Sequence, residues 1–234
     1  NFGLYFVAWR KRSLAVLWRD VEARTYVVLL TASVVGVALF LAWHGVYAGF
    51  AESLRHAAFN VVSIATTTGY ATVDYAQWPI FAPVFMLFLC SFATCAGSTG
   101  GGIKLVRSLL LLKQARLELV RVIHPRAVVP LRLGSTTVSS QVMSSVIAFM
   151  LLYGSVMVVA TLALLLSGLD LVTASTAAIA CINNTGPGLG QVGPAGNFQG
   201  LSDFQTWVCT ISMLLGRLEL VAVMVVFTAS FWRR

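Results

Sequence analysis

Long stretches without a charged residue alternate with short clusters of lysine and arginine along this chain. Tyr26 to Trp43 contains 18 residues without a charge, and Ser139 to Ser167 is also charge-free. Eighteen helical residues extend about 27 Å, which is close to the thickness of the hydrocarbon core of a bilayer. Only 10% of the residues are charged and 58% are hydrophobic, so the charges are too few to cover a water-exposed surface. The sequence therefore predicts an all-α integral membrane protein.

The basic residues are concentrated in a few places. Of 16 lysines and arginines, 14 fall in Arg10–Arg24, Lys104–Arg132 and Arg233–Arg234. Basic clusters between apolar spans follow the positive-inside rule, so we expect these three segments in the cytoplasm. The opposite side is expected to carry four acidic residues, Glu52, Asp74, Asp170 and Asp203. The net charge of +8 is therefore interpreted as a topology signal, with anionic membrane lipids rather than nucleic acid as neighbours.

The same order of segments occurs twice in the sequence. Each copy has a long helix, a short helix that cannot cross a bilayer, a glycine-containing turn and a second long helix. The first copy comprises Tyr26–Trp43, Ser53–Ala65, Thr66–Tyr70 and Ile80–Leu112. The second copy comprises Ser139–Ser167, Thr173–Ile182, Asn183–Pro187 and Thr206–Trp232. This repetition predicts a fold of two units that each contain a long helix, a short re-entrant helix, a turn and a second long helix. Such units resemble the helix–pore-helix–helix (M1-P-M2) units of the potassium-channel-like superfamily.

The repeats suggest a division of the chain into three parts. Residues 1–25 are expected to form the end of a preceding transmembrane helix and a basic cytoplasmic linker. Residues 26–132 and 133–234 are expected to form the two repeats. Because the chain opens without an initiator methionine or a signal peptide, we expect it to be part of a longer polypeptide.

The two glycine-containing turns have a composition suited to conducting a cation. The C-terminus of the preceding helix carries about half a negative charge, which favours a cation next to it. Backbone carbonyls of the turn can replace the water around an ion, and glycine permits the positive φ that this alignment requires. A single turn of this type is more often an ordinary helix cap, but two in equivalent places favour an ion filter. The candidate filter residues are Thr66, Thr67, Thr68, Gly69, Tyr70, Asn183, Asn184, Thr185, Gly186 and Pro187.

A run of small residues interrupts the second long segment of the first copy. It consists of Gly97, Ser98, Thr99, Gly100, Gly101 and Gly102. A continuous helix does not favour this composition, and unwound backbone in a membrane is tolerated only beside water or protein. A phosphate-binding loop is disfavoured, because Ile103 separates the glycines from Lys104 and no Ser or Thr follows the lysine. The sequence therefore predicts an intramembrane loop.

Arg217 lies midway through the last predicted span, Thr206–Trp232. An unpaired arginine at that depth costs at least about 2.5–3.5 kcal/mol on insertion scales. One interpretation is that Arg217 pairs with Glu219 or with backbone carbonyls at a helix contact. The other is that Arg217 is an electrostatic plug below the filter, which repels cations and holds the Gly97–Gly102 loop. The two interpretations are compatible and both stay open.

Four motifs resemble those of the Trk/Ktr/HKT superfamily of potassium transporters, and most closely the bacterial TrkH-type uptake proteins. They are Ala65–Tyr70, Ala96–Lys104, Asn183–Gly190 and Leu215–Glu219, which occur in the family's order over nearly the whole chain. The resemblance implies that these two repeats are the third and fourth of four around one pore. The missing N-terminal half of the transporter would supply two further turns. One departure is Thr185, which stands where the family often has an apolar residue.

The resemblance also implies how such a pore works. Potassium would bind to the backbone carbonyls of Thr67, Thr68, Asn184 and Thr185. Each repeat would contribute one key glycine to the filter, Gly69 and Gly186. The Gly97–Gly102 loop and Arg217 would form a gate below the filter.

The implied partners follow from the same resemblance. They are a second copy of the transporter, giving a homodimer, and a cytoplasmic nucleotide-binding regulatory subunit of the TrkA type. The basic segment Lys104–Arg132 is the expected docking surface for that subunit. The implied location is the bacterial inner membrane.

Two other classes of function stay open. An ion-coupled secondary transporter would also have broken helices, although the commonest such folds have inverted repeats and these repeats run in the same direction. A non-conducting membrane scaffold would use the short helices only for packing. No Ser/His/Asp or paired-carboxylate constellation is apparent in the sequence, so an enzyme is not expected. No cofactor is expected beyond the transported ion.

Overall fold

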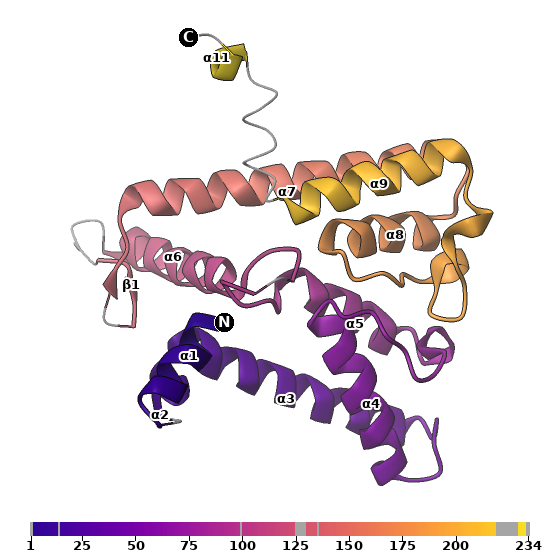
Figure 1. Ribbon diagram of the computed structural model, residues 1–234, viewed down its shortest axis with the longest axis horizontal. Coiled ribbons are helices and arrows are strands. Elements are labelled where there is room, and N and C mark those ends of the chain that lie inside the picture. Colours follow the sequence, from indigo (N-terminus) through magenta and orange to yellow (C-terminus); the bar gives the residue numbers. More distant parts are fainter. Residues whose placement is uncertain are drawn as a thin grey trace.

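The computed structural model describes residues 2–13, 15–98, 100–124, 130–134, 136–218 and 229–232. Most of them are helical, as predicted (Figure 1). The helices are α1 (Phe2–Arg10), α2 (Ala15–Arg19), α3 (Val21–Trp43), α4 (Phe50–Ala65), α5 (Phe81–Phe92), α6 (Leu105–Ile123), α7 (Ser140–Leu166), α8 (Leu171–Asn183), α9 (Asp203–Arg217) and α11 (Ala229–Trp232). The other elements are short 3-10 helices at Tyr75–Gln77, Gly190–Val192 and Phe198–Gly200, and a hairpin of β1 (Arg132–Leu133) and β2 (Thr136–Thr137).

The order of helices repeats as the sequence predicts. The first copy contains α3, α4 and α5, and the second contains α7, α8 and α9. Within each copy the long helix packs on the short one, α3 on α4 and α7 on α8. The short helix then packs on the next helix, α4 on α5 and α8 on α9. The two copies meet where α5 contacts α8 (Figure 1).

Polar caps set the ends of the two longest helices. Ser139 and Ser167 cap α7, so its limits agree with the charge-free stretch. Helix α3 begins at Val21, earlier than the predicted start at Tyr26. The reason is that the Asp20 carboxylate accepts a backbone N–H of the first turn at 2.7 Å and starts the helix inside the basic segment.

The predicted interruption of the span Ile80–Leu112 is confirmed. Helix α5 ends at Phe92 and helix α6 begins at Leu105, and the described residues between them, 93–98 and 100–104, form no helix. Helix α6 continues well beyond Leu112, so much of the expected basic loop is helical. Its apolar face accounts for the extension, because Leu117 also packs against the cluster that Leu110 forms with Met143 and Val146 of α7.

The last predicted span is described only in part. Helix α9 begins before the predicted start at Thr206, because Ser202 and Gln205 form a reciprocal capping box. The helix ends at Arg217. Residues 219–228, and with them Glu219, lie outside the described residues.

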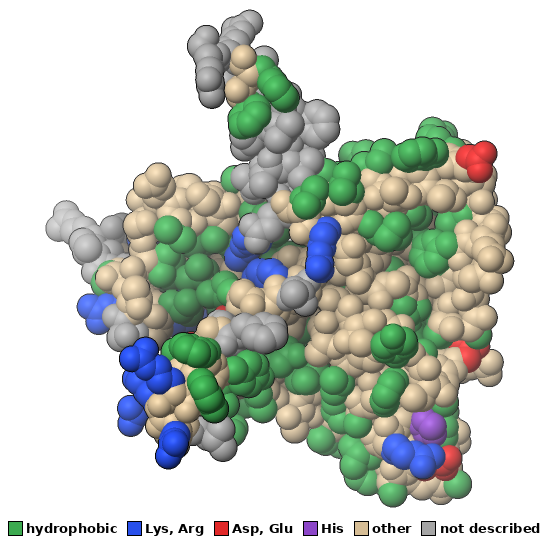
Figure 2. All heavy atoms as spheres, in the orientation of Figure 1, with side chains coloured by type: hydrophobic (Ala, Val, Ile, Leu, Met, Phe, Trp, Pro, Cys, Tyr) green, Lys and Arg blue, Asp and Glu red, His purple; other side chains and the backbone are tan. Residues whose placement is uncertain are grey.

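The described helices present the surface of a chain that spans a bilayer. Helices α3 and α7 are each long and apolar enough to cross a membrane. Their outer faces expose large hydrophobic side chains, among them Val28, Leu39, Leu151 and Val159. Figure 2 shows most lysine and arginine over α1 and α2 and near the central loop, whereas aspartate and glutamate lie toward the opposite end. The positive-inside rule associates such basic clusters with the cytoplasm, and for this chain that orientation stays a prediction.

We predict that the first turn of α8 depends on Asp170. Its carboxylate accepts the Thr173 backbone N–H at 3.0 Å, and this bond lowers the pKa of Asp170. The stabilisation is therefore present above the ordinary aspartate pKa and is lost as the pH falls through the lowered value. Asp170→Ala should cost about 1 kcal/mol at neutral pH, measured as a lower thermal unfolding midpoint of the full-length protein in detergent.

Asp170→Asn is the matched control for this prediction, because an amide oxygen can still accept the N–H. The difference between the parent and Asp170→Ala should shrink in acid. An Asp170→Asn variant as unstable as Asp170→Ala would contradict capping as the cause.

Candidate functional site

The turns that follow α4 and α8 have the same backbone conformation. Thr67 and Asn184 are both left-handed, with φ of +55° and +54°. Two residues later, the glycines Gly69 and Gly186 have φ of +84° and +108°. The two turns are therefore structural repeats, although their sequences differ.

Hydrogen bonds reproduce the same pattern in both turns. The Thr68 N–H donates to the Ser63 carbonyl at 2.8 Å, and the Thr185 N–H donates to the Ala180 carbonyl at 2.9 Å. Each bond spans five residues and folds the turn back over the last turn of its helix. The C-terminal end of each short helix is thus followed at once by backbone held in a fixed shape.

The two turns also lie against each other. A Cβ atom placed on Gly69 would overlap the carbonyl oxygen of Thr185 and would lie 3.4 Å from Cδ of Pro187. Gly186 is different, because a Cβ there meets no atom within 4 Å and only its positive φ disfavours a side chain. The two predicted key glycines are therefore required for two different physical reasons.

The predicted filter side chains do not all lie on the same side of their turns. The hydroxyls of Thr66 and Thr68 are 2.8 Å apart, and Tyr70 is 72% exposed. By contrast, Asn183 is fully buried, and the Thr185 hydroxyl is buried with no hydrogen-bond partner among the described residues. Two side chains of the second turn are thus buried inside the protein, unlike the exposed Tyr70 of the first turn.

Asn184 fixes the second turn from another direction. Its Nδ2 donates to the Met213 carbonyl of α9 at 3.2 Å. On the same helix, a Cβ atom on Gly216 would overlap the carbonyl oxygen of Ile182. Helix α9 therefore packs tightly against the end of α8 and the start of the turn.

The glycine-rich loop lies directly against both turns. A Cβ atom on Gly100 would come within 3.1 Å of the Thr67 hydroxyl. The same atom on Gly101 or Gly102 would overlap Asn183. Gly97 and Gly102 both have positive φ, +73° and +76°. The candidate gate residues Gly97, Ser98, Gly100, Gly101 and Gly102 are thus placed beside the candidate filter, and Thr99 lies outside the described residues.

Two charged side chains outside the predicted filter and gate residues hold this loop. Lys104 Nζ donates to the carbonyls of Ser98 at 3.1 Å and Gly100 at 2.5 Å. Glu22, in the first turn of α3, accepts the Ala96 N–H. Lys104 lies two residues after the glycine run, and this proximity could have identified it. Nothing in the sequence connects Glu22 with a loop 74 residues away.

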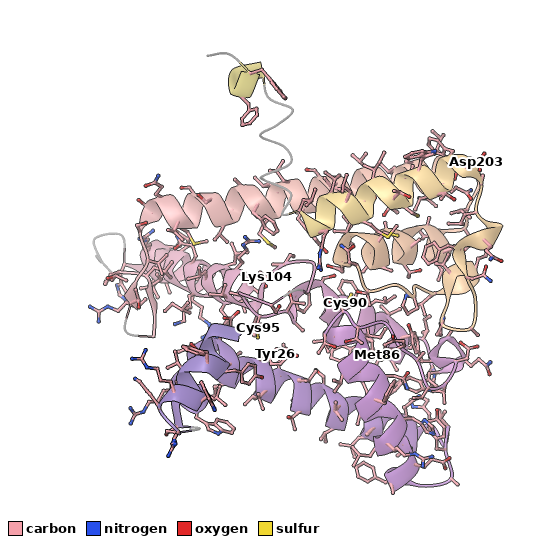
Figure 3. The ribbon with its side chains drawn as sticks, viewed as in Figure 1. Tyr26, Met86, Cys90, Cys95, Lys104 and Asp203 are labelled. Carbon is pink, nitrogen blue, oxygen red and sulfur yellow. The ribbon has the colours of Figure 1, made fainter. Side chains whose placement is uncertain are left out.

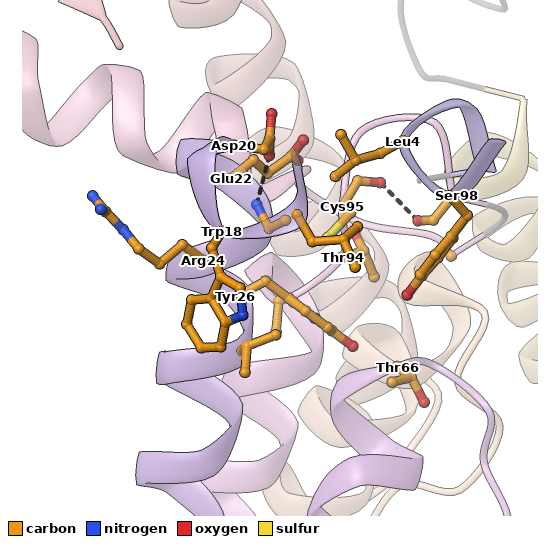
Figure 4. Close-up of a pocket in the computed structure, with 16 residues that line it drawn as sticks. Leu4, Trp18, Asp20, Glu22, Arg24, Tyr26, Thr66, Thr94, Cys95 and Ser98 are labelled. Carbon is orange, nitrogen blue, oxygen red and sulfur yellow. Dashed lines mark hydrogen bonds between the residues drawn. The ribbon is translucent and has the colours of Figure 1, made fainter. Parts of the chain in front are cut away.

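Two cavities border the loop. One of about 420 Å³ reaches from Asp20 and Glu22 at the start of α3 to Thr66 in the first turn (Figure 4). The other, of about 230 Å³, is lined by the loop together with Lys104, Arg107 and Arg217. Figure 3 places Lys104 near the centre of the molecule, between the two copies.

Arg217, the last residue of α9, lines this second cavity. It follows Gly216, which contacts the end of α8, and it faces the same space as Gly97 and Gly102. Arg107 lines the same cavity, and its guanidinium carbon lies 4.0 Å from the centroid of the Phe149 ring. The predicted neighbourhood of Arg217 and the loop is therefore present, and the predicted pairing with Glu219 falls outside the described residues.

Comparison with known proteins places this geometry in a family. The profile of the TrkH family, described as "Cation transport protein", matches residues 4–234. The chain is 41% identical over 233 residues to the Trk system potassium uptake protein TrkH of Escherichia coli K12. It is 38% identical over 234 residues to the Trk system potassium uptake protein TrkG of the same organism. Each match covers all of this chain and 48% or 47% of the relative, so the chain spans about half the length of these proteins.

A solved structure agrees with the sequence relatives. The crystal structure of the potassium transporter TrkH from Vibrio parahaemolyticus superposes with a TM-score of 0.93 at 39% identity. The superposition covers 100% of this chain and 50% of that one. The repeated M1-P-M2 fold expected from the sequence is thereby confirmed. This chain belongs to the TrkH family of cation transport proteins.

Proposed function

We propose that this chain forms half of a pore for potassium uptake, as the C-terminal half of a TrkH-type transporter. The observation that carries the proposal is the pair of turns with the same backbone shape, which contact each other at the C-terminal ends of two short helices. Both helix ends are electronegative, which favours a cation beside the turns. Two further turns, supplied by the rest of the polypeptide, complete the filter.

The filter binds potassium through backbone carbonyls. Those of Thr67, Thr68, Asn184 and Thr185 are the proposed ligands, since Gly69 and Gly186 permit the backbone shape that aligns them. The burial of the Thr185 hydroxyl supports this assignment, because a side chain behind the turn leaves its carbonyl on the other side. The presence of threonine at this position is therefore compatible with ion binding.

The loop Gly97–Gly102 and Arg217 form the proposed gate. The loop contacts Thr67 and Asn183, so it lies where it can close the pathway beside the filter. The Lys104 ammonium and the Glu22 carboxylate stabilise its present shape. Arg217 adds positive charge to the same cavity, which disfavours a cation there.

The cellular setting follows from the distribution of charge. We place the three basic segments, Arg10–Arg24, Lys104–Arg132 and Arg233–Arg234, on the cytoplasmic side of a bacterial inner membrane. The transporter acts as a homodimer with a nucleotide-binding regulatory subunit of the TrkA type. That subunit docks on the basic segment Lys104–Arg132, whose side chains Arg116 and Arg121 point away from the buried face of α6.

We predict that a serine at either filter glycine impairs potassium uptake by the full-length transporter. Gly69→Ser overlaps the Thr185 carbonyl, and Gly186→Ser forces a non-glycine residue to φ +108°. Strain of about 1–3 kcal/mol at a binding turn corresponds to a loss of about five- to 150-fold in binding. The measurement is growth at low potassium of a bacterium that lacks its own uptake systems.

Gly154→Ser is the matched control, because a Cβ atom there meets nothing within 4 Å and the residue lies within helix α7. It should support growth like the parent. If the parent itself does not restore growth despite good membrane expression, potassium uptake is the wrong assignment. Normal growth with both filter variants would favour a scaffold in which the turns only pack.

We also predict that Lys104→Met increases potassium flux in the absence of the regulatory subunit. The substitution keeps the length of the side chain but removes two charge-assisted bonds to loop carbonyls. Such bonds contribute about 1.5–3 kcal/mol each, enough to shift a closed loop toward open states at least about tenfold. Purified full-length transporter in liposomes, assayed for potassium flux, provides the measurement.

Lys113→Met is the control for Lys104→Met. Lys113 also donates to a backbone carbonyl, that of Arg132 at 2.8 Å, but on the exposed side of α6. Its substitution should leave the flux unchanged. Equal flux for the parent and Lys104→Met, in transporters that still conduct, would remove the loop from the gating mechanism.

A further inference from the structure

Asn183 is the point where the buried polar contacts of the two copies converge. It is the last residue of α8 and is fully buried. The Tyr153 hydroxyl of α7 donates to Asn183 Oδ1 at 3.0 Å, and Asn183 Nδ2 donates to the Ser91 hydroxyl of α5 at 3.2 Å. A third bond runs from Nδ2 to the Ile179 carbonyl at 2.9 Å. One amide therefore connects three helices.

The glycine-rich loop rests on this same residue. A Cβ atom on Gly101 would overlap the backbone of Asn183, and one on Gly102 would overlap its Oδ1. The end of the loop is held by the same neighbour, because the Ile103 N–H donates to the Ser91 carbonyl at 2.7 Å. Ser91 thus binds Asn183 with its side chain and the loop with its backbone.

The second filter turn begins at the next residue. Asn184 takes the left-handed conformation directly after Asn183, and the carbonyls of Asn184 and Thr185 are the proposed potassium ligands. Two covalent bonds separate the Asn183 Cα from the Asn184 nitrogen, so a displacement of Asn183 displaces the turn. The loop and the turn therefore cannot move independently while the bridge from Tyr153 through Asn183 to Ser91 is intact.

We infer that Asn183 is a positioning residue that couples the glycine-rich loop to ion selection in the second filter turn. Tyr153 and Ser91 fix its amide, Gly101 and Gly102 press on it, and its backbone leads into the filter. This inference rests on the proposed potassium pore. It changes the role expected for Asn183, whose side-chain oxygen is engaged by Tyr153 rather than directed at an ion.

The test compares potassium and sodium flux through the full-length transporter in liposomes. Tyr153→Phe removes one bond to Asn183 and retains the ring, and Ser91→Ala removes the other bond and retains the backbone contact to the loop. Each variant should lower the ratio of potassium to sodium flux by about three- to tenfold, the effect of one net hydrogen bond. Tyr75→Phe is the matched control, since the Tyr75 hydroxyl is buried and bonds to no described residue. It should leave the ratio unchanged.

Coupling to the loop requires a second comparison. In the Lys104→Met background, where the loop is released, Tyr153→Phe should change the flux ratio less than it does in the parent. Lower total flux with an unchanged potassium-to-sodium ratio in both Tyr153→Phe and Ser91→Ala would overturn the inference, because it would reduce Asn183 to a packing role. Equal effects of Tyr153→Phe in both backgrounds would also overturn it. Failure of the parent to conduct potassium would instead contradict the proposed pore.

Discussion

The close approach of backbone to backbone around the end of α8 is the constraint on which the rest of the site depends. Gly69, Gly101 and Gly216 each lie where a Cβ atom would overlap a main-chain atom of residues 182–185. Three segments remote in sequence thereby reach one helix end without intervening side chains. Contact at this distance leaves almost no free volume, so a shift in one segment is transmitted to the others. Glycine is needed here for space more than for flexibility.

Buried polar groups around the end of α8 are held in fixed positions by the hydrogen bonds that they make. Asn183 and Tyr153 lie among apolar helices, where an unpaired polar atom is costly, and they satisfy each other. Two carbonyls of the glycine-rich loop, those of Ser98 and Gly100, accept hydrogen bonds from Lys104 in the same way. Irregular backbone inside an apolar layer is tolerated because its polar atoms have partners within the protein.

Much of this architecture could be predicted from the sequence, and the reasons are physical. Charge-free length predicted α3 and α7, and the glycine run after Cys95 predicted the break between α5 and α6. The turns after Ala65 and Asn183 were recognisable because two glycines recur in equivalent places. Helix starts were less accurate, since Asp20 and Ser202 cap their helices earlier than the hydrophobic pattern begins.

The contacts that assemble the site were not predictable in the same way. Glu22 binds the loop across 74 residues, and no periodicity or composition connects the two segments. Asn183 was predicted as a filter residue, but its side chain is buried and bonds to Tyr153 of α7 and Ser91 of α5. The direction of a side chain at a helix end depends on which residues of other helices surround it. A local sequence pattern does not show those residues.

The position of Lys104 has a consequence for how the loop can change shape. An ammonium group and a potassium ion are both monovalent cations that carbonyl oxygens can bind. The carbonyls of Ser98 and Gly100 therefore bind the Lys104 ammonium much as they would bind a free cation. Without the Lys104 ammonium, the carbonyl dipoles of Ser98 and Gly100 would converge without a counter-charge. The loop would then have to change shape, or its carbonyls would have to accept hydrogen bonds from other donors, because converging dipoles repel each other. For the gate proposed above, this predicts two discrete arrangements of the loop, one with the Lys104 ammonium bound to these carbonyls and one without it.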